Sequence, residues 1–410
     1  MAQPSCRHCA GSPQLCRALP AIDYTAGMTW PADEIARLTE LRRTLHRNPE
    51  LSGEERRTAA RVRDYLVELS PDRIIKGIGG HGLAAIYDGD DPGPTVLFRC
   101  ELDALPIAET GRPAHRSTVH GKSHMCGHDG HMAVVTALAH HFARRRPKTG
   151  RAVLLYQPAE ETGAGAQAVI ADPKYAQLAP DYAFALHNMP GLPLGHVAVQ
   201  PGPVNCASRG MRIELTGFTA HASEPEAGRS PAQALATLLQ QIPGLGNANS
   251  MGPDFAMVTL THARLGEPSF GVAPGEASLW LTLRTTLDDT MTDLVARAEA
   301  LAQQAAAGAG LDVAITFHDV FHHCENDAEA TAVLERALDR TGTPRAAYAY
   351  PMRASEDFGL YGETARSAMF LLGSGEDSPH LHHSDYDFPD ELIARGAAVF
   401  AAAADELLGR

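Results

Sequence analysis

The sequence predicts an α/β fold in which a mostly parallel sheet is covered by helices and interrupted by an inserted ferredoxin-like α+β domain. Short, continuously apolar runs alternate with helical patterns in the first half of the chain, as expected for strands buried on both faces. Farther along, alternating apolar positions indicate a one-sided antiparallel sheet. A chain of 410 residues is also long enough for two domains.

The first domain is expected to open with two helices. The apolar spacing predicts a helix over 33–46, and Asn48-Pro49 ends it. Ser52-x-x-Glu55 has the form of a capping box and predicts a second helix directly after it. The other elements expected in this domain are a helix at His131–Phe142 and apolar strands at Leu83–Tyr87, Thr95–Arg99, Ala152–Tyr156, Ala183–Leu186 and Ala368–Leu372.

The middle of the chain follows a different pattern, in which Leu279, Leu281 and Leu283 alternate with other residues. The expected order strand-helix-strand-strand-helix-strand is ferredoxin-like. Its elements are Arg212–Thr216, Pro231–Ile242, Met257–Ala263, Ala277–Thr285, Asp289–Ala309 and Val313–Phe317. The expected boundaries are an N-terminal extension over 1–28, a first domain over 29–206 and 318–410, and the insertion over 207–317.

Composition disfavours several classes of function. The formal net charge of -14 disfavours a nucleic-acid partner. No apolar run approaches the roughly 20 residues of a membrane span, and the first 28 residues hold no apolar stretch typical of a secretory signal. Seven scattered cysteines favour a reducing compartment, so a cytoplasmic protein is expected. Cys6-x-x-Cys9 is explained more simply by incidental thiols in a loose tail than by a metal site with His8 and Cys16.

Polar side chains follow four of the predicted strands, at the edge where open α/β sheets form their sites. They are Glu101 and Asp103, then Glu160-Glu161, then His187-Asn188, and finally His380, His382 and His383. The segment between the first two groups adds His124, Cys126, His128, Asp129 and His131. Carboxylates, imidazoles and one thiolate at a shared edge can neutralise two divalent cations.

Each of these groups has a simpler explanation when it is taken alone. Cys126 would be a buried thiol, and His187 a hydrogen-bonded histidine at a strand end. The adjacent glutamates would be a solvated surface, and the late histidine pair a solvated loop. Their occurrence together after successive strands favours a metal site over these separate explanations.

Glu160 and Glu161 can divide two roles between them, because adjacent residues on a loop can point in different directions. One carboxylate can bind metal while its neighbour takes a proton from the attacking water and delivers it to the leaving nitrogen. Two cations lower the pKa of water and polarise a carbonyl group. This division of labour predicts hydrolysis of an amide bond.

Eight motifs carry a family resemblance. They are Leu45-His46-Arg47-Asn48-Pro49-Glu50-Leu51, Glu101-Leu102-Asp103-Ala104-Leu105-Pro106, Cys126-Gly127-His128-Asp129-Gly130-His131, Pro158-Ala159-Glu160-Glu161, Leu186-His187-Asn188, Ala220-His221-Ala222-Ser223, Glu356-Asp357-Phe358, and His382-His383 before Tyr386-Asp387-Phe388. Together they resemble the amidohydrolase branch of the aminoacylase and dinuclear carboxypeptidase family over nearly all of residues 34–405. That branch includes hippurate hydrolases, N-acyl-amino-acid amidohydrolases and plant auxin-conjugate hydrolases.

The resemblance implies a cofactor and a role for each residue at the centre. Two divalent metal ions are expected, zinc or manganese first, with cobalt or nickel as alternatives. The implied ligands, with the first bridging both ions, are Cys126, His128, Glu161, His187 and His383. Glu160 is the implied general base and acid, and Asp103 would orient a ligand.

The resemblance also implies that the inserted domain acts as a lid and as the surface through which a homodimer forms. His221 would reach the site, across the dimer, to stabilise the oxyanion, although alone it would be an ordinary turn histidine. Arg284 would clamp the substrate carboxylate, with pairing to Asp288 or Asp289 as the equally simple alternative. Asn188 is expected to be a second substrate contact.

The sequence departs from the family pattern at three places within the matched region. Gly271 stands where relatives usually carry an asparagine, so one substrate or oxyanion contact would be missing or supplied by another residue. Thr162-Gly163-Ala164 replaces a more glycine-rich stretch, and Glu101 stands where an aspartate is common.

These observations predict a metal-dependent amidohydrolase for N-acyl or N-aroyl amino acids. One alternative is a cysteine hydrolase with Cys126 as nucleophile, which has no use for Glu160, Glu161 or the distal His383. The other alternative is a catalytically silent metal-binding dimeric scaffold, for which Gly271 is the only hint.

Overall fold

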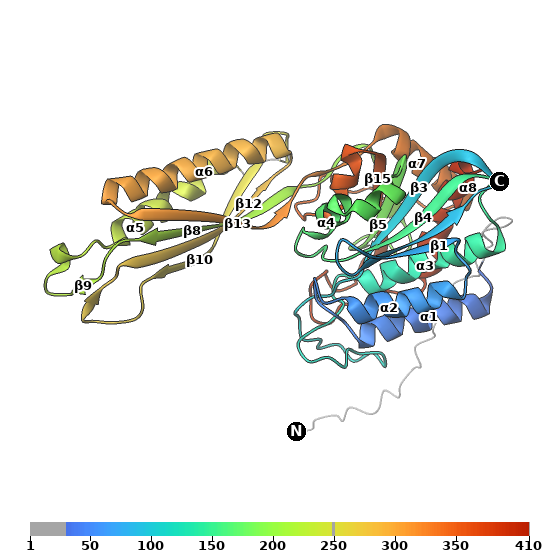
Figure 1. Ribbon diagram of the computed structural model, residues 1–410, viewed down its shortest axis with the longest axis horizontal. Helices are drawn as coiled ribbons and strands as arrows, with labels where there is room; N and C mark the ends of the chain where they lie inside the picture. Colours follow the sequence, from blue (N-terminus) through green and yellow to red (C-terminus); the bar gives the residue numbers. More distant parts are fainter. Residues whose placement is uncertain (1–29, 248–250, 410) are drawn as a thin grey trace, which may run out of the picture.

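The computed structural model describes residues 30–247 and 251–409. It has two lobes, a larger one that holds both ends of the described chain and an elongated smaller one formed by the middle of the chain (Figure 1). The predicted α/β fold with an inserted α+β domain is confirmed. The expected N-terminal extension over 1–28, with its Cys6-x-x-Cys9 segment, lies outside the described residues.

The large lobe is built on a seven-stranded sheet with the order β1-β2-β4-β3-β5-β15-β6. The four strands β4, β3, β5 and β15 are parallel, whereas the edge strands pair antiparallel. The bounds are β1 (Arg73–Ile78), β2 (Gly82–Asp88), β3 (Asp91–Glu101), β4 (Thr149–Gln157), β5 (Tyr182–Pro190), β6 (Val197–Ala198) and β15 (Arg366–Gly375). All five strands predicted for this lobe are present.

Helices cover both faces of this sheet. One face packs against α1 (Ala32–Arg47), α2 (Arg56–Val67), α3 (His128–Arg144), α7 (Ala328–Thr341) and α8 (Leu392–Leu407). The other face packs against α4 (Gly165–Ala171) and the 3-10 helices η1 (Pro173–Gln177) and η4 (Asp357–Glu363). Because α1 and α8 flank α3, most of α3 is buried. No helix in the described ranges is both long and apolar enough to cross a membrane.

The expected capping box at the start of α2 is not formed. The Glu55 side chain makes no cap hydrogen bond to the helix and instead accepts from the backbone N–H groups of Gly53 (2.7 Å) and Ala159 (2.9 Å). The Ser52 hydroxyl donates to Oδ2 of Asp103 at 2.7 Å. Both side chains therefore tie this turn to the strand-end loops that carry the candidate site.

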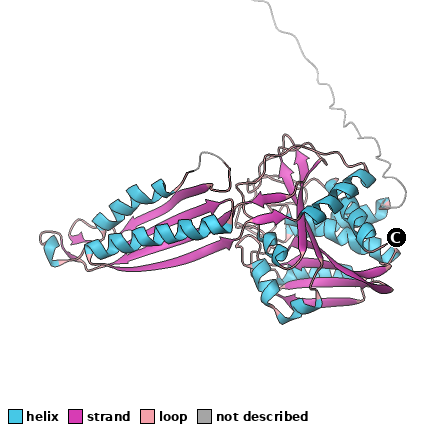
Figure 2. Cartoon of the chain, turned by 90° about the horizontal axis from the view of Figure 1, so that it is seen from above, coloured by secondary structure: helices cyan, strands magenta, loops and turns pink. Residues whose placement is uncertain are grey.

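The small lobe has a four-stranded antiparallel sheet with the order β10-β12-β8-β13, which is the predicted ferredoxin-like arrangement. Its strands are β8 (Ala207–Thr216), β10 (Ala256–Leu265), β12 (Glu276–Thr285) and β13 (Asp312–Phe321), so the last strand runs past the expected boundary at 317. The helices α5 (Ala232–Gln241) and α6 (Asp288–Ala309) cover one face of the sheet (Figure 2). Short elements complete this lobe: η2 (Pro225–Ala227), η3 (Ile242–Leu245), β9 (Ala220–His221) and β11 (Val272–Ala273).

Two chain segments connect the lobes. The strand β7 (Gly202–Asn205) leads into β8, and β14 (Cys324–Asn326) follows β13 on the return. These two short strands pair antiparallel with each other. Residues at the inner ends of β8, β12 and β13 line one cavity together with residues at the carboxyl ends of the large lobe's strands.

Candidate metal centre

The turn before α3 and the end of β5 supply three of the expected ligands. Gly127 adopts a left-handed conformation (φ +87°) between Cys126 and the first helical residue, His128. On β5, Nδ1 of His187 bonds to the carbonyl oxygen of Asn188 at 2.8 Å. The other ring nitrogen, Nε2, lies 3.4 Å from Sγ of Cys126. The hydrogen bond at Nδ1 therefore leaves Nε2 free to act as a ligand.

His128 has the arrangement typical of a metal-binding histidine. Its Nδ1 bonds to the carbonyl oxygen of Asp103 at 2.9 Å. Its Nε2 lies 3.7 Å from Oε2 of Glu160 and 3.8 Å from Oε1 of Glu161. This Nε2 is buried and has no hydrogen-bond partner within the described ranges. A cation between the imidazole and the two carboxylates would satisfy it.

Asp103 and His382 position the remaining groups. Oδ2 of Asp103 accepts the backbone N–H of Glu161 at 3.0 Å, which holds the glutamate loop in place. Nε2 of His382 lies 3.7 Å from Oε2 of Glu161. The family resemblance implied His383 as the ligand here, but the structure brings His382 to this place. His382 has a left-handed backbone (φ +65°), and the His383 ring instead packs 5.5 Å from the His380 ring.

The candidate ligands form overlapping groups whose donor atoms lie within 4.8 Å of one another. One group contains Cys126, His128 and His187, and a second contains Cys126, Glu161 and His382. Because Cys126 belongs to both groups, its thiolate is placed to be shared by two cations. The donor set of one thiolate, three imidazoles and one carboxylate suits divalent transition metals.

Added positive charge would stabilise the ionised forms of the acidic side chains at the site. Burial raises the pKa of Glu160 well above its usual value, and the nearby Glu356 and Glu161 carboxylates add to the effect. Burial also raises the pKa of Glu161 to about 7 and that of the Cys126 thiol well above its usual range. Burial lowers the pKa of His187 to about 3, so this imidazole is neutral and able to bind metal. The positively charged side chains at the site are therefore too few to keep all of its acidic side chains ionised.

Candidate ligands from both groups line a cavity of about 510 Å³ between the two lobes. Arg284 of β12 lines this cavity, and its Nη1 donates to the carbonyl oxygen of Arg353 (2.8 Å) and to Oγ of Ser355 (2.9 Å). The described residues show no ion pair of Arg284 with Asp288 or Asp289, and the Asp288 carboxylate instead accepts from His322 and His323. Apolar lining comes from Met189, Phe321, Met352 and Leu381.

The candidate site lies within a region that matches a known enzyme family. The profile of the peptidase family M20/M25/M40 matches residues 97–406, which is most of the chain. The chain belongs to this family. The predicted enzyme class, a metal-dependent amidohydrolase, is confirmed at the level of the family.

Several relatives within this family have named activities or solved structures. The chain is 28% identical over 364 residues to a protein named hippurate hydrolase from Campylobacter jejuni, covering 88% of this chain and 94% of that protein. It is 30% identical over 346 residues to a protein named N-acetyldiaminopimelate deacetylase from Priestia megaterium, covering 84% and 91%. The crystal structure of the Bacillus subtilis YXEP protein, described as a dinuclear metal-binding peptidase, superposes with a TM-score of 0.77 and 26% identity over 92% of this chain and 99% of that one.

His221 of this M20/M25/M40 enzyme does not line the cavity of its own chain. It lies on β9, at the end of the small lobe farthest from the large lobe (Figure 1). The side chain is exposed, and its Nδ1 lies 2.7 Å from Oγ of Ser223. Gly271 accepts the backbone N–H of Ala222 at this same far tip, and a Cβ there would meet no atom within 4 Å. A role for either residue in catalysis therefore requires a second subunit.

Asn188, the expected second substrate contact, does not line the cavity. It is fully buried, and it is absent from the lining of the cavity. Its carboxamide oxygen contacts Nε2 of His131 at 2.5 Å, and its carboxamide nitrogen donates to the Tyr386 hydroxyl at 2.6 Å. Both polar atoms of the side chain are therefore used to support the site from behind.

Sequence reasoning missed the buried charge network beneath Glu160. Arg99 is almost completely buried and pairs with Glu101, with Glu356 at 3.0 Å and with Asp357 at 2.5 Å. The second oxygen of Glu101 contacts Nδ1 of His131 at 2.6 Å. The available signal was an arginine inside an otherwise apolar strand, because such a residue is almost never buried without a partner. Two of its three carboxylate partners, Glu356 and Asp357, come from a segment far away in the sequence.

Proposed function

We propose that this chain is a dinuclear metal amidohydrolase that releases the acyl group from N-acyl or N-aroyl amino acids. One observation carries the proposal: Glu160 lines the cavity directly beside two ligand groups that share Cys126. Glu160 also stands with His128 and Glu161 in a third group of donor atoms, and we propose that its carboxylate stays off the metal ions, as general base catalysis of amide hydrolysis needs. The relatives named hippurate hydrolase and N-acetyldiaminopimelate deacetylase support an acylated amino acid as the substrate class.

The proposed metal ligands are the groups that the structure brings together. They are Cys126, His128, Glu161, His187 and His382, with the cysteine shared, and zinc or manganese is proposed ahead of cobalt or nickel. When bound, the two cations lower the pKa of water and polarise the amide carbonyl. Asp103 holds both the His128 ring and the glutamate loop, so it positions ligands without lining the cavity itself.

Glu160 is the proposed proton carrier. Its carboxylate takes a proton from the water that attacks the carbonyl carbon of the substrate. It then delivers that proton to the amide nitrogen, and the C–N bond breaks to release a carboxylic acid and the free amine of the amino acid. Glu160 is only 5% exposed, which limits the contact of its carboxylate with bulk water.

The cavity offers separate places for the two ends of such a substrate. Arg284 supplies a cation whose guanidinium is held by backbone and hydroxyl oxygens rather than by a carboxylate. It is therefore available for the carboxylate of the amino acid. Met189, Phe321 and Leu381 form an apolar surface that suits an acyl or aroyl group.

A homodimer through the small lobe completes the proposal. The face of the β10-β12-β8-β13 sheet opposite α5 and α6 carries exposed side chains, among them Trp280 at 44% exposure. Pairing of two such lobes would carry the far tip of one chain toward the cavity of the other. His221 would then donate a hydrogen bond to the oxyanion that forms during amide hydrolysis.

Glu160→Gln tests the central claim. The variant is expected to lose about 100- to 10,000-fold in kcat toward acetyl and benzoyl amino acids, the range supplied by general acid-base catalysis, while it keeps two metal ions per chain. Full activity in this variant would show that the role of Glu160 is wrong. Elemental analysis of the same protein sample shows whether loss of metal, rather than loss of the base, explains an inactive variant.

Chelation separates the proposal from its competitors. Removal of the metal is expected to abolish turnover and re-addition to restore it, whereas a thiol nucleophile at Cys126 would survive chelation. A panel of acetyl, benzoyl and indole-acetyl amino acids covers the substrate class. Absence of metal-dependent release across that panel would instead favour a silent scaffold.

A further inference from the structure

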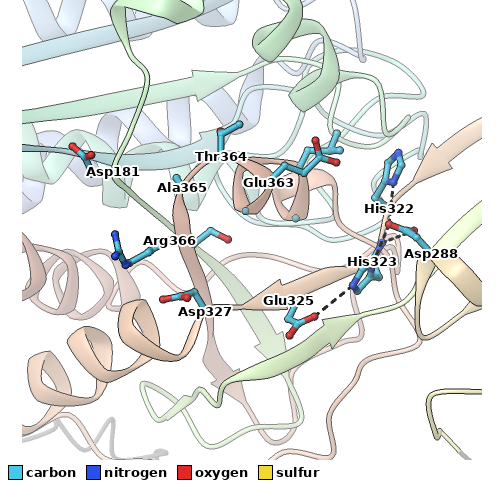
Figure 3. A pocket seen from close by; sticks show the side chains of 14 residues that line it. Asp181, Asp288, His322, His323, Glu325, Asp327, Glu363, Thr364, Ala365 and Arg366 are labelled. Carbon is cyan, nitrogen blue, oxygen red and sulfur yellow. Dashed lines mark hydrogen bonds and ion pairs between the residues drawn. The ribbon is translucent and has the colours of Figure 1, made fainter.

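A second group of metal-binding side chains lies at the junction of the two lobes, outside the proposed dinuclear centre. Asp288 is the first residue of α6 in the small lobe, and His322 and His323 stand between β13 and β14, where the chain returns to the large lobe. These three side chains line a pocket of about 590 Å³ (Figure 3). We call them the hinge triad.

The donor atoms of the hinge triad converge. Nδ1 of His322 and Nδ1 of His323 each lie 3.0 Å from the same carboxylate oxygen, Oδ2 of Asp288. The other oxygen, Oδ1, accepts the backbone N–H of His323 at 3.2 Å, which holds the carboxylate in place. Zinc bonds of about 2.0–2.2 Å in tetrahedral geometry place neighbouring ligand atoms roughly 3.3–3.5 Å apart. The two separations from Oδ2 of Asp288 are slightly shorter, so a cation could enter with a small outward shift of the carboxylate.

The surroundings of the hinge triad also suit a cation. Nε2 of His323 lies 3.6 Å from Oε2 of Glu325, as the dashed line in Figure 3 marks. A carboxylate near the second ring nitrogen is one of the partners that metal-binding histidines usually have, because such a partner sets the tautomer and the ring direction. The pocket lining contains five carboxylates and one arginine, Arg366, so its charge is strongly negative. The His322 side chain is 40% exposed, so an ion can enter from solvent.

We propose that Asp288, His322 and His323 bind one divalent transition-metal ion of the zinc class, in addition to any ions held in the main cavity. Two imidazole donors favour such a cation over calcium or magnesium, which prefer oxygen ligands. The ion joins the first turn of α6 to the returning strand. It would therefore tie the small lobe to the segment through which the chain returns to the large lobe.

Metal stoichiometry tests this site. Wild-type protein and the His322→Ala/His323→Ala double variant are dialysed against the same series of buffered Zn²⁺ concentrations, and bound zinc per chain is measured by elemental analysis. The double variant is expected to bind one equivalent less than wild type. His318→Ala, which removes an exposed histidine of β13 that lies outside the triad, is the matched control and is expected to bind as wild type does. Equal zinc binding by wild type and the double variant would overturn the proposal.

Two further variants protect the test against simple misfolding. Asp288→Asn preserves side-chain volume and is expected to raise the zinc dissociation constant of this site at least tenfold. Glu325→Gln, at a side chain that is 56% exposed, is expected to raise it by about 10- to 100-fold, the usual effect of losing the carboxylate behind a histidine ligand. Unchanged affinity in a folded Asp288→Asn protein rules out the site. The one zinc equivalent that the double variant is expected to lose does not depend on how many ions the main cavity holds. The proposed hinge-triad site and the proposed function can therefore fail separately.

Discussion

Nε2 of His382 lies 3.7 Å from Oε2 of Glu161, although these two side chains come from the two separate sequence segments of the large lobe. The approach depends on the backbone of His382, which is left-handed (φ +65°) and donates its N–H to the carbonyl oxygen of Met125 at 2.9 Å. Adjacent histidines therefore have different surroundings, and only a folded chain distinguishes them.

His382→Ala and His383→Ala form a matched pair. His382→Ala is expected to lose a metal ion and at least about 100-fold in kcat, because a ligand is removed from the Cys126 and Glu161 group. His383→Ala is expected to keep both metal content and kcat within about twofold of wild type. Elemental analysis and steady-state kinetics measure the two effects. The reverse pattern would return the ligand role to His383.

Gly127→Ala is expected to damage the turn that carries two ligands. A Cβ at this position would lie 2.3 Å from Oδ1 of Asn188, and the φ of +87° already strains any residue other than glycine. We expect the free energy of unfolding to fall by about 2–4 kcal/mol and metal affinity to fall with it. Gly121→Ala is the control, because its φ is +74° but its Cβ would meet no atom within 4 Å. Chemical denaturation should show a loss of only about 1 kcal/mol there.

Arg284→Ala is expected to impair substrate binding more than chemistry. Loss of a charged hydrogen bond worth about 1.5–3 kcal/mol predicts a KM roughly 10- to 150-fold higher for N-acyl amino acids, with kcat changed little. The matching amino-acid amides, which lack the carboxylate, should show no such difference. Arg353→Ala is the control, since Arg353 supports Arg284 through its backbone carbonyl group, which the substitution keeps. An equal effect on acids and amides would contradict the carboxylate contact.

His221 can be tested by mixing two inactive proteins. His221→Ala lacks the proposed oxyanion donor, and Glu160→Gln lacks the base. After dissociation and reassociation, half of the dimers are mixed, and each mixed dimer contains one complete site in which Glu160 and His221 come from different chains. Equal mixing is therefore expected to recover about a quarter of wild-type activity. Failure to recover any activity in a confirmed mixed dimer would exclude catalysis across the dimer.

His46 is expected to make stability depend on pH. Burial lowers its pKa, but the nearby Asp129 carboxylate and a hydrogen bond to it outweigh burial and raise the pKa of His46 to about 9. Because the folded pKa is raised, this stabilisation is complete below about pH 6.5 and is lost as pH rises through 9. Its size is on the order of 3 kcal/mol. Urea denaturation of the metal-free protein between pH 6.5 and 10 measures it, and the decline should be smaller in His46→Gln. Equal declines in both proteins would show that other groups are responsible.

Local sequence patterns were sufficient to predict the two sheets and the region of the site. Apolar runs such as Thr95–Arg99 indicate a strand that is buried on both faces. The alternation in Ala277–Thr285 indicates a strand that is buried on one face. Glu160, His187 and the residues around Cys126 follow strand ends, and parallel strand ends meet at one edge by geometry. These features depend on short-range periodicity, so the sequence by itself determined them.

The direction of individual side chains was decided only by the tertiary structure. The choice of His382 over His383 depends on one left-handed backbone torsion, and Asn188 turns inward because His131 and Tyr386 reach it from other segments. Two of the three ion-pair partners of Arg99, Glu356 and Asp357, likewise come from a segment far away in the sequence. Periodicity reports whether a position is buried, but contacts between distant segments determine which atoms a buried polar group faces.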